Sequence, residues 1–169
     1  MTCPLVRSII GLLCVLLLLP SISLGSTPTV GEQAPPFMYS DLNAGGVSPF
    51  ETFERNRPIV LTFLQTACRS CHREMLALKR LKVELEGFGV MAVFIDMTVR
   101  NVKKYVEENE LPFVCTWDSS GEIAETYGVS FSPTSFLLDA ERKVVNVYRG
   151  FHPGVERTMK SDLEGLLAR

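Results

Sequence analysis

Apolar and polar positions along the chain change their period several times, and each change predicts a strand or a helix. Residues 59–64 are apolar and rich in β-branched side chains, which favours a strand. Residues 90–95 form a continuous apolar run, as expected for a strand buried on both faces. Between these runs, residues 69–85 follow the helical period. The apolar positions on one face of that helix are Met75, Leu78, Leu81 and Leu85.

The rest of the chain continues this alternation of strands and helices. Helices are predicted at about 99–110, 122–127 and 153–167, and strands at 112–116, 134–139 and 143–148. A short strand pair at 37–42 and 45–50 precedes them, although residues 49–54 could instead form one helical turn. The order predicts an α/β fold, with a mixed central β-sheet covered by helices on both faces and an N-terminal β extension.

The first 25 residues have the pattern of a signal peptide. Arg7 is their only charged side chain, residues 9–19 are apolar, and small side chains place a cleavage site after Gly25. The apolar run is shorter than the ~20 residues that span a bilayer. We therefore expect residues 26–169 to be exported to the periplasm or another extracytoplasmic space. An uncleaved membrane anchor is the alternative, because residues 21–24 could extend the run.

Charge and length narrow the classes of partner. Removal of the signal leaves 144 residues, which suits one domain with a single core. These residues hold 16 basic and 19 acidic side chains, a formal charge of −3 without a basic stripe. Nucleic-acid binding therefore has no support. We expect a monomer that meets a membrane only if the N-terminal segment is uncleaved.

Cys68 and Cys71 are the strongest candidates for chemistry. They flank Arg69 and Ser70 at the predicted start of a helix, where the helix dipole favours a thiolate. Cys71 follows one turn later on the same face, so the pair can open and close a short disulfide without a cofactor. The charge of Arg69 and the hydroxyl of Ser70 also favour a thiolate on Cys68.

Other uses of the cysteines are less well supported. A closed zinc site needs two more ligands, but the chain has only His72 and His152 and no second CxxC motif, so we expect no metal. A structural disulfide across so short a loop removes little unfolded-state entropy. Cys115, in an apolar strand, is expected to be a buried thiol. The odd count of cysteines after export excludes a fully paired disulfide framework.

Several segments also match a known family in order and spacing. They are the lead-in at 30–35, the strand and helix at 59–78, the stretch 118–129, and Ser132-Pro133-Thr134-Ser135-Phe136-Leu137-Leu138-Asp139. Together they resemble the thioredoxin superfamily, in particular its exported TlpA/ResA-like branch of thiol-disulfide oxidoreductases. The resemblance spans roughly Val30 to Gly150 and implies a thioredoxin-like domain over residues 26–169.

The resemblance implies roles for residues around the cysteines. Cys68 matches the solvent-facing nucleophile, whose thiolate attacks a partner's disulfide and forms a mixed disulfide. Cys71 matches the buried resolving thiol that attacks back and releases the reduced partner, so the two form a redox-active disulfide. Pro133 matches the family's cis-proline. Its loop, which includes Ser132, faces the CxxC motif and receives substrate backbone.

Acidic residues and departures from the family pattern qualify this picture. Glu74 and Asp96 match acids frequent near such sites, and either could relay a proton; surface or helix-pairing roles are the alternatives. Thr62 stands where thioredoxin has a buried acid, so that proton route is expected to be absent. Ala67 replaces the usual Trp before the first cysteine, which changes the surface where a partner docks.

The resemblance implies a protein-disulfide reductase. Its partners would be client proteins that carry disulfides, such as apocytochrome c with its haem-attachment cysteines, and a membrane thiol reductant that donates electrons. The direction of exchange depends on the redox poise of the pair, which the sequence leaves open.

Two other functions are compatible with the same fold. A peroxiredoxin-like thiol peroxidase usually has a Thr three positions before its cysteine and a Pro upstream. Here position 65 is Gln and Thr66 lies two positions before Cys68. A redox-inactive binding module is the other alternative, and the intact CxxC motif argues against it.

Overall fold

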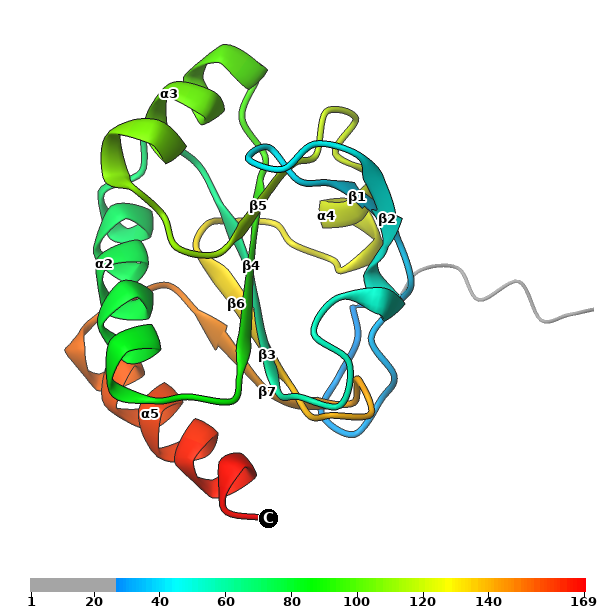
Figure 1. Ribbon diagram of the computed structural model, residues 1–169, viewed down its shortest axis with the longest axis vertical. Coiled ribbons are helices and arrows are strands. Elements are labelled where there is room, and N and C mark those ends of the chain that lie inside the picture. Colours follow the sequence, from blue (N-terminus) through cyan, green and yellow to red (C-terminus); the bar gives the residue numbers. More distant parts are fainter. Residues whose placement is uncertain (1–26) are drawn as a thin grey trace, which may run out of the picture.

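The structure is a computed structural model that describes residues 27–169 (Figure 1). The predicted signal peptide at 1–25 lies outside the described residues and stays a prediction. None of the helices within residues 27–169 combines the length and the hydropathy that a bilayer crossing requires.

The elements follow the predicted order. The strands are β1 (Met38–Ser40), β2 (Val47–Pro49), β3 (Ile59–Leu64), β4 (Gly89–Phe94), β5 (Val114–Trp117), β6 (Thr134–Leu138) and β7 (Val144–Arg149). The helices are α2 (Arg69–Glu84), α3 (Val99–Asn109), α4 (Glu122–Thr126), α5 (Pro153–Leu167) and the 3-10 turn η2 (Phe50–Thr52). Both interpretations of residues 37–54 hold in part, because β1 pairs antiparallel with β2 and the helical turn η2 follows directly.

Most strands differ from their predicted ranges by one or two residues at an end, and the shift at β5 has a physical cause. The strand expected at 112–116 starts at Val114 and extends to Trp117. Pro112 has no N–H to donate to a strand ladder, so the chain joins the sheet only after it.

The central sheet has the strand order β5-β4-β3-β6-β7. Strand β3 lies at its centre, parallel to β4 and antiparallel to β6, which confirms the predicted mixed sheet. Every side chain of β3 and β4 is buried. This explains the nearly unbroken apolar runs in the sequence, because strands covered on both faces have no solvent-facing side.

Two apolar clusters cover the two faces of the sheet. One contains Met75 and Leu78 of α2, Val102 of α3 and Met159 of α5. The other joins Tyr127, at the end of α4, to η2 and the N-terminal extension. Figure 1 shows α2 and α5 on one side of the sheet and α4 with the β1–β2 hairpin on the other. Helices therefore cover both faces, as the sequence predicts.

The strand register brings three loops together at one end of the central strands. The parallel strands β3 and β4 both end there, with Leu64 beside Phe94. Strand β6 runs the opposite way, so it starts at this end, with Thr134 beside Phe63. The segments after β3, after β4 and before β6 therefore meet, and they carry Cys68, Asp96 and Pro133.

Candidate active site

Cys68 and Cys71 form a disulfide at the start of α2. Their Cα atoms lie 5.2 Å apart. Cys68 is the N-cap residue of the helix, with extended backbone angles, and its sulfur accepts a hydrogen bond from the backbone N–H of Cys71 at 3.1 Å. Cys68 is half-buried, whereas Cys71 is only 1% exposed. One sulfur of the pair thus lies near the surface, and the other lies inside the protein.

The helix start offers further contacts to the outer sulfur. The hydroxyl oxygen of Ser70 lies 3.2 Å from the Cys68 sulfur. The backbone N–H groups of a first helical turn and the positive end of the dipole both favour a thiolate at this position. The Arg69 side chain is exposed.

The loop before β6 faces the disulfide from the other side. The Ser132–Pro133 peptide is cis, and the Ser132 carbonyl oxygen lies 3.8 Å from the Cys68 sulfur. The Ser132 hydroxyl also donates to the side-chain oxygen of Gln65 at 3.0 Å, which links this loop to the segment before Cys68. Pro133 itself is buried. The structure thus brings Ser132 and Pro133 to the CxxC motif.

Glu74 lies inside the protein beneath this site. Its side chain is 1% exposed, which excludes the surface role considered from the sequence. The Thr62 hydroxyl donates to Glu74 Oε1 at 2.9 Å, and the Ser135 hydroxyl also contacts that oxygen. Position 62 carries no acid, yet the site contains one, because the buried carboxyl of Glu74 lies against the Thr62 hydroxyl. Helix α2 places the Glu74 carboxyl against Thr62.

Burial raises the pKa of the Glu74 carboxyl to about 7, although hydrogen bonds from Ser135 and Thr62 partly oppose the shift. The geometry supports a protonated carboxyl. The Ser135 hydroxyl is 2.7 Å from the Thr62 hydroxyl, so three oxygens contact one another in a closed ring. Two hydroxyl protons can satisfy only two of these contacts. A protonated Glu74 would supply the third by donating to the Ser135 hydroxyl, in place of the bond that Ser135 donates to the ionised carboxylate.

Asp96 holds the loop in front of Cys68. Its carboxylate accepts hydrogen bonds from the Thr66 backbone N–H at 3.1 Å and from the Thr66 hydroxyl at 2.5 Å. Its backbone carbonyl accepts from Trp117 Nε1 at 2.8 Å. Asp96 therefore anchors the segment that carries Ala67 and Cys68, a positioning role that the sequence interpretation did not include.

His72 and Tyr105 form a further contact near the site. His72 Nδ1 and the Tyr105 hydroxyl are 3.0 Å apart, and the two rings meet edge to face. Burial raises the pKa of the Tyr105 hydroxyl to about 12. The pair ties the first turn of α2 to α3. This link joins segments that are distant in the sequence.

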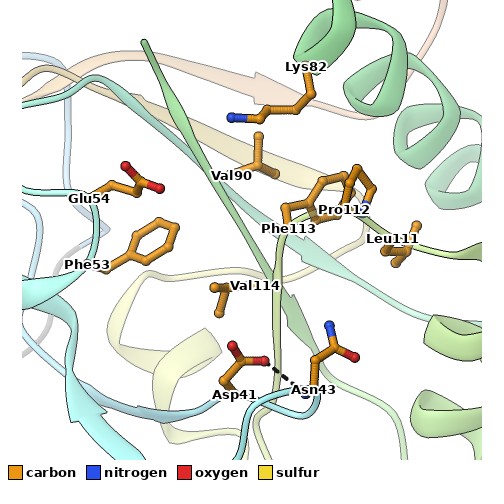
Figure 2. Close-up of a pocket in the computed structure, with 10 residues that line it drawn as sticks. All are labelled: Asp41, Asn43, Phe53, Glu54, Lys82, Val90, Leu111, Pro112, Phe113 and Val114. Atoms are coloured by element: carbon orange, nitrogen blue, oxygen red, sulfur yellow. Dashed lines mark hydrogen bonds between the residues drawn. The ribbon is translucent and has the colours of Figure 1, made fainter. Parts of the chain in front are cut away.

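A separate hollow lies at the opposite end of the strands. It has a volume of about 280 Å³ and is lined by Val90 and Val114, at the starts of β4 and β5, and by Asp41 and Asn43 of the β1–β2 turn. Figure 2 shows these side chains together with Lys82 and Glu54. None of its lining residues belongs to the CxxC segment. The disulfide therefore does not face this hollow.

The fold and the site together define a class of protein. A disulfide at a helix N-terminus, faced by a cis-proline loop on a mixed sheet, is the arrangement of thioredoxin-fold proteins. Residues 30–147 match the model of the AhpC/TSA family, and the chain belongs to that family.

Named relatives agree with this assignment. The chain is 34% identical over 123 residues to the thiol-disulfide oxidoreductase ResA of Bacillus thuringiensis subsp. konkukian, covering 72% of this chain and 70% of the relative. It is 33% identical over 142 residues to ResA of Bacillus anthracis, covering 83% and 78%.

Solved structures agree as well. A candidate thiol:disulfide interchange protein DsbE from Chlorobium tepidum matches with a TM-score of 0.77 and 25% identity, over 83% of this chain and 99% of that one. StoA from Bacillus subtilis has the same fold, with a TM-score of 0.63 and 19% identity over 76% and 96% of the two chains. Together with the Cys68–Cys71 disulfide, these relationships identify the chain as a thiol-disulfide oxidoreductase.

Proposed function

We propose that the protein reduces disulfide bonds of client proteins outside the cytoplasm by exchange through Cys68 and Cys71. The observation that carries the proposal is the asymmetry of the pair. Cys68 caps the helix near the surface, whereas Cys71 is only 1% exposed. An outer sulfur can meet a protein disulfide, and an inner sulfur is protected from other thiols.

The exchange proceeds in two balanced steps. The Cys68 thiolate attacks one sulfur of the client disulfide, a new bond joins Cys68 to the client, and the other client sulfur leaves as a thiolate. The Cys71 thiolate then attacks the Cys68 sulfur. The Cys68–Cys71 disulfide forms, and the second client thiolate leaves. Two electrons pass from the protein to the client, and an external dithiol must supply two electrons for the next cycle.

Glu74 is the proposed proton acceptor for Cys71. It lies one helical turn beyond Cys71 on α2. With a pKa raised to about 7 by burial, its carboxyl can both take up and release a proton near neutral pH. It can therefore accept the Cys71 proton when that thiol attacks, and return a proton when the disulfide is reduced again.

Location and partners form part of the same proposal. A signal at residues 1–25 would deliver the domain to a compartment where disulfides persist. The relatives named ResA and the DsbE-like structure support a role as a thiol-disulfide oxidoreductase. A membrane thiol reductant would donate the electrons, and apocytochrome c with oxidised haem-attachment cysteines is a candidate client. We propose that the protein acts as a monomer.

The reduction potential of the pair tests the direction of exchange. The protein is equilibrated with glutathione buffers, and the fraction of Cys68–Cys71 disulfide is measured by alkylation and mass spectrometry. We expect a potential well below ~−200 mV, since a reductant must lie below its clients. A value near that of the strongest dithiol oxidants, about −120 mV, would make the protein an oxidase.

Cys115→Ala is the matched control for the thiol assignment. Cys115 is buried and its thiol pKa is raised to about 12 by burial, so this variant should keep the wild-type potential. Rapid consumption of hydrogen peroxide that Cys68→Ser abolishes would instead support the peroxidase alternative.

A further inference from the structure

The outer face of α2 carries a stripe of side chains that starts beside the disulfide. Arg69, Arg73, Leu76, Arg80 and Val83 follow one another at intervals of three or four residues, so they lie on one helical face. All five are exposed. We call them the α2 stripe. Leu76 and Val83 are exposed by 40% and 86%, so the stripe is both basic and apolar.

The exposed charge of α2 has one sign over most of its length. The only acid before Glu84 is Glu74, which is 1% exposed and faces the interior. Arg80 is paired, because its guanidinium lies 2.7 Å from the Glu156 carboxylate on α5. Within residues 27–169, Arg69 and Arg73 have neither a hydrogen-bond nor an ion-pair partner from their side chains. The free positive charge is thus concentrated in the half of the stripe nearest Cys68.

A hollow lies beside this basic half. It has a volume of about 210 Å³ and lies between α2 and the segment that joins β7 to α5. Arg73 and Leu76 line one side of it, and Phe151 lines the other. An apolar side chain can occupy such a hollow while an acidic neighbour pairs with Arg73.

We propose that the α2 stripe binds a client segment that has acidic side chains close to its target cysteine and an apolar side chain further along. The client is held at Cys68 during the mixed disulfide, so its flanking residues must lie over neighbouring surface. This inference rests on the proposed reductase function and adds the class of client. The overall charge of the protein is negative, so the basic start of α2 is a local feature.

Helix geometry gives the spacing of the client residues. At ~1.5 Å per residue, Arg73 lies about 7 Å and Leu76 about 12 Å along the helix from Cys68. An extended client advances ~3.3 Å per residue. The acid should therefore lie about two residues from the client cysteine, and the apolar side chain about four.

Synthetic disulfide peptides test this proposal with the full-length reduced protein. Three peptides share one sequence, with a fluorophore and a quencher across the disulfide, a Leu four residues from the cysteine, and Glu, Gln or Lys two residues from it. Each rate of reduction is divided by the rate of the same peptide with dithiothreitol, which removes differences in intrinsic disulfide reactivity. The ratio of the Glu peptide to the Lys peptide then reports recognition by the protein.

We expect the Glu peptide to react about tenfold faster than the Lys peptide at low salt, because an exposed ion pair contributes up to about fivefold and two arginines are available. The preference should shrink in 0.5 M NaCl. Arg73→Glu should bring the ratio near one or reverse it. The matched control Arg157→Glu makes the same charge change at an exposed site on α5 and should keep the wild-type ratio.

Leu76→Gln tests the apolar part of the stripe. It should remove the advantage of the Leu peptide over one with Gln at that position, while the preference for Glu over Lys remains. Equal rates for all three peptides, or an unchanged ratio in Arg73→Glu, would overturn the proposed docking but leave the reductase function intact. Failure to reduce any of the peptides would overturn both.

Discussion

Replacing Glu74 with Gln should remove a pH dependence from the stability of the protein. Gln keeps an oxygen that can accept from Thr62 and Ser135 but cannot ionise. In the wild type, burial raises the pKa of the Glu74 carboxyl from 4.5 to about 7. A raised pKa of an acid means that the folded state binds the proton more tightly than the unfolded state. The stability present below pH 4.5 is therefore lost as the pH rises towards 7.

The size of the loss follows from the two pKa values. Between pH 5 and pH 8, ionisation of Glu74 should lower the unfolding free energy of the wild type by about 2–3 kcal/mol. Glu74→Gln should lack this decrease, so the difference in unfolding free energy between the two proteins should change by that amount over the same range. Groups that titrate alike in both proteins cancel in the difference.

Urea unfolding followed by circular dichroism, at several pH values, measures this difference. The oxidised protein is used so that Cys68 and Cys71 do not titrate. Glu86→Gln, an exposed acid just beyond the end of α2, is the matched control and should follow the wild-type curve. A Glu74→Gln difference that stays constant within about 0.5 kcal/mol from pH 5 to pH 8 would refute the assignment of Glu74 as a buried acid that gains its proton on folding.

Two other side chains carry predictions about structure. Asp96→Ala removes the carboxylate that accepts from the Thr66 backbone N–H and hydroxyl, so we expect a loss of about 1–3 kcal/mol in unfolding free energy and slower disulfide exchange. Thr66→Val keeps its backbone N–H and should lose less on both measures. Unchanged stability and exchange rate in Asp96→Ala would contradict the anchoring role. The buried Arg142 donates to the backbone carbonyls of Phe53 and of neighbouring residues, so Arg142→Met should lower the melting temperature and reduce the unfolding free energy by about 2–4 kcal/mol. Arg149→Met, at an exposed site on β7, should change the melting temperature little. Identical melting curves for Arg142→Met and the wild type would show that those carbonyls do not depend on Arg142.

Periodicity in the sequence was enough to predict the mixed sheet and the helix that carries Cys71. It could also have indicated that Glu74 is buried. Glu74 lies three residues after Cys71 and four before Leu78, so this acid interrupts the otherwise apolar, buried face of α2. An acid at such a position indicates either that the helix assignment is wrong or that the acid is a buried functional group.

Other parts of the site could not be found from local patterns. The bonds between Asp96 and Thr66 join loops at the ends of two parallel strands, and the side-chain conformations in loops do not follow from periodicity. The ring that links Glu74 to Thr62 and Ser135 depends on the register of β3 against β6, where Thr62 lies beside Ser135. Strand pairing over more than 70 residues of sequence is set by the whole core, not by either segment alone.

In the proposed exchange, Cys68 attacks client disulfides and Cys71 resolves the mixed disulfide. Trapping with Cys71→Ser tests both roles. The reduced variant is mixed with an extract of disulfide-bearing proteins from the extracytoplasmic compartment, and the products are analysed by non-reducing electrophoresis and mass spectrometry. We expect mixed disulfides that join Cys68 to client cysteines, disappear on reduction, and do not form with the double variant Cys68→Ser, Cys71→Ser. If Cys71→Ser forms no mixed disulfide, or forms it through Cys115, the proposed exchange mechanism is contradicted.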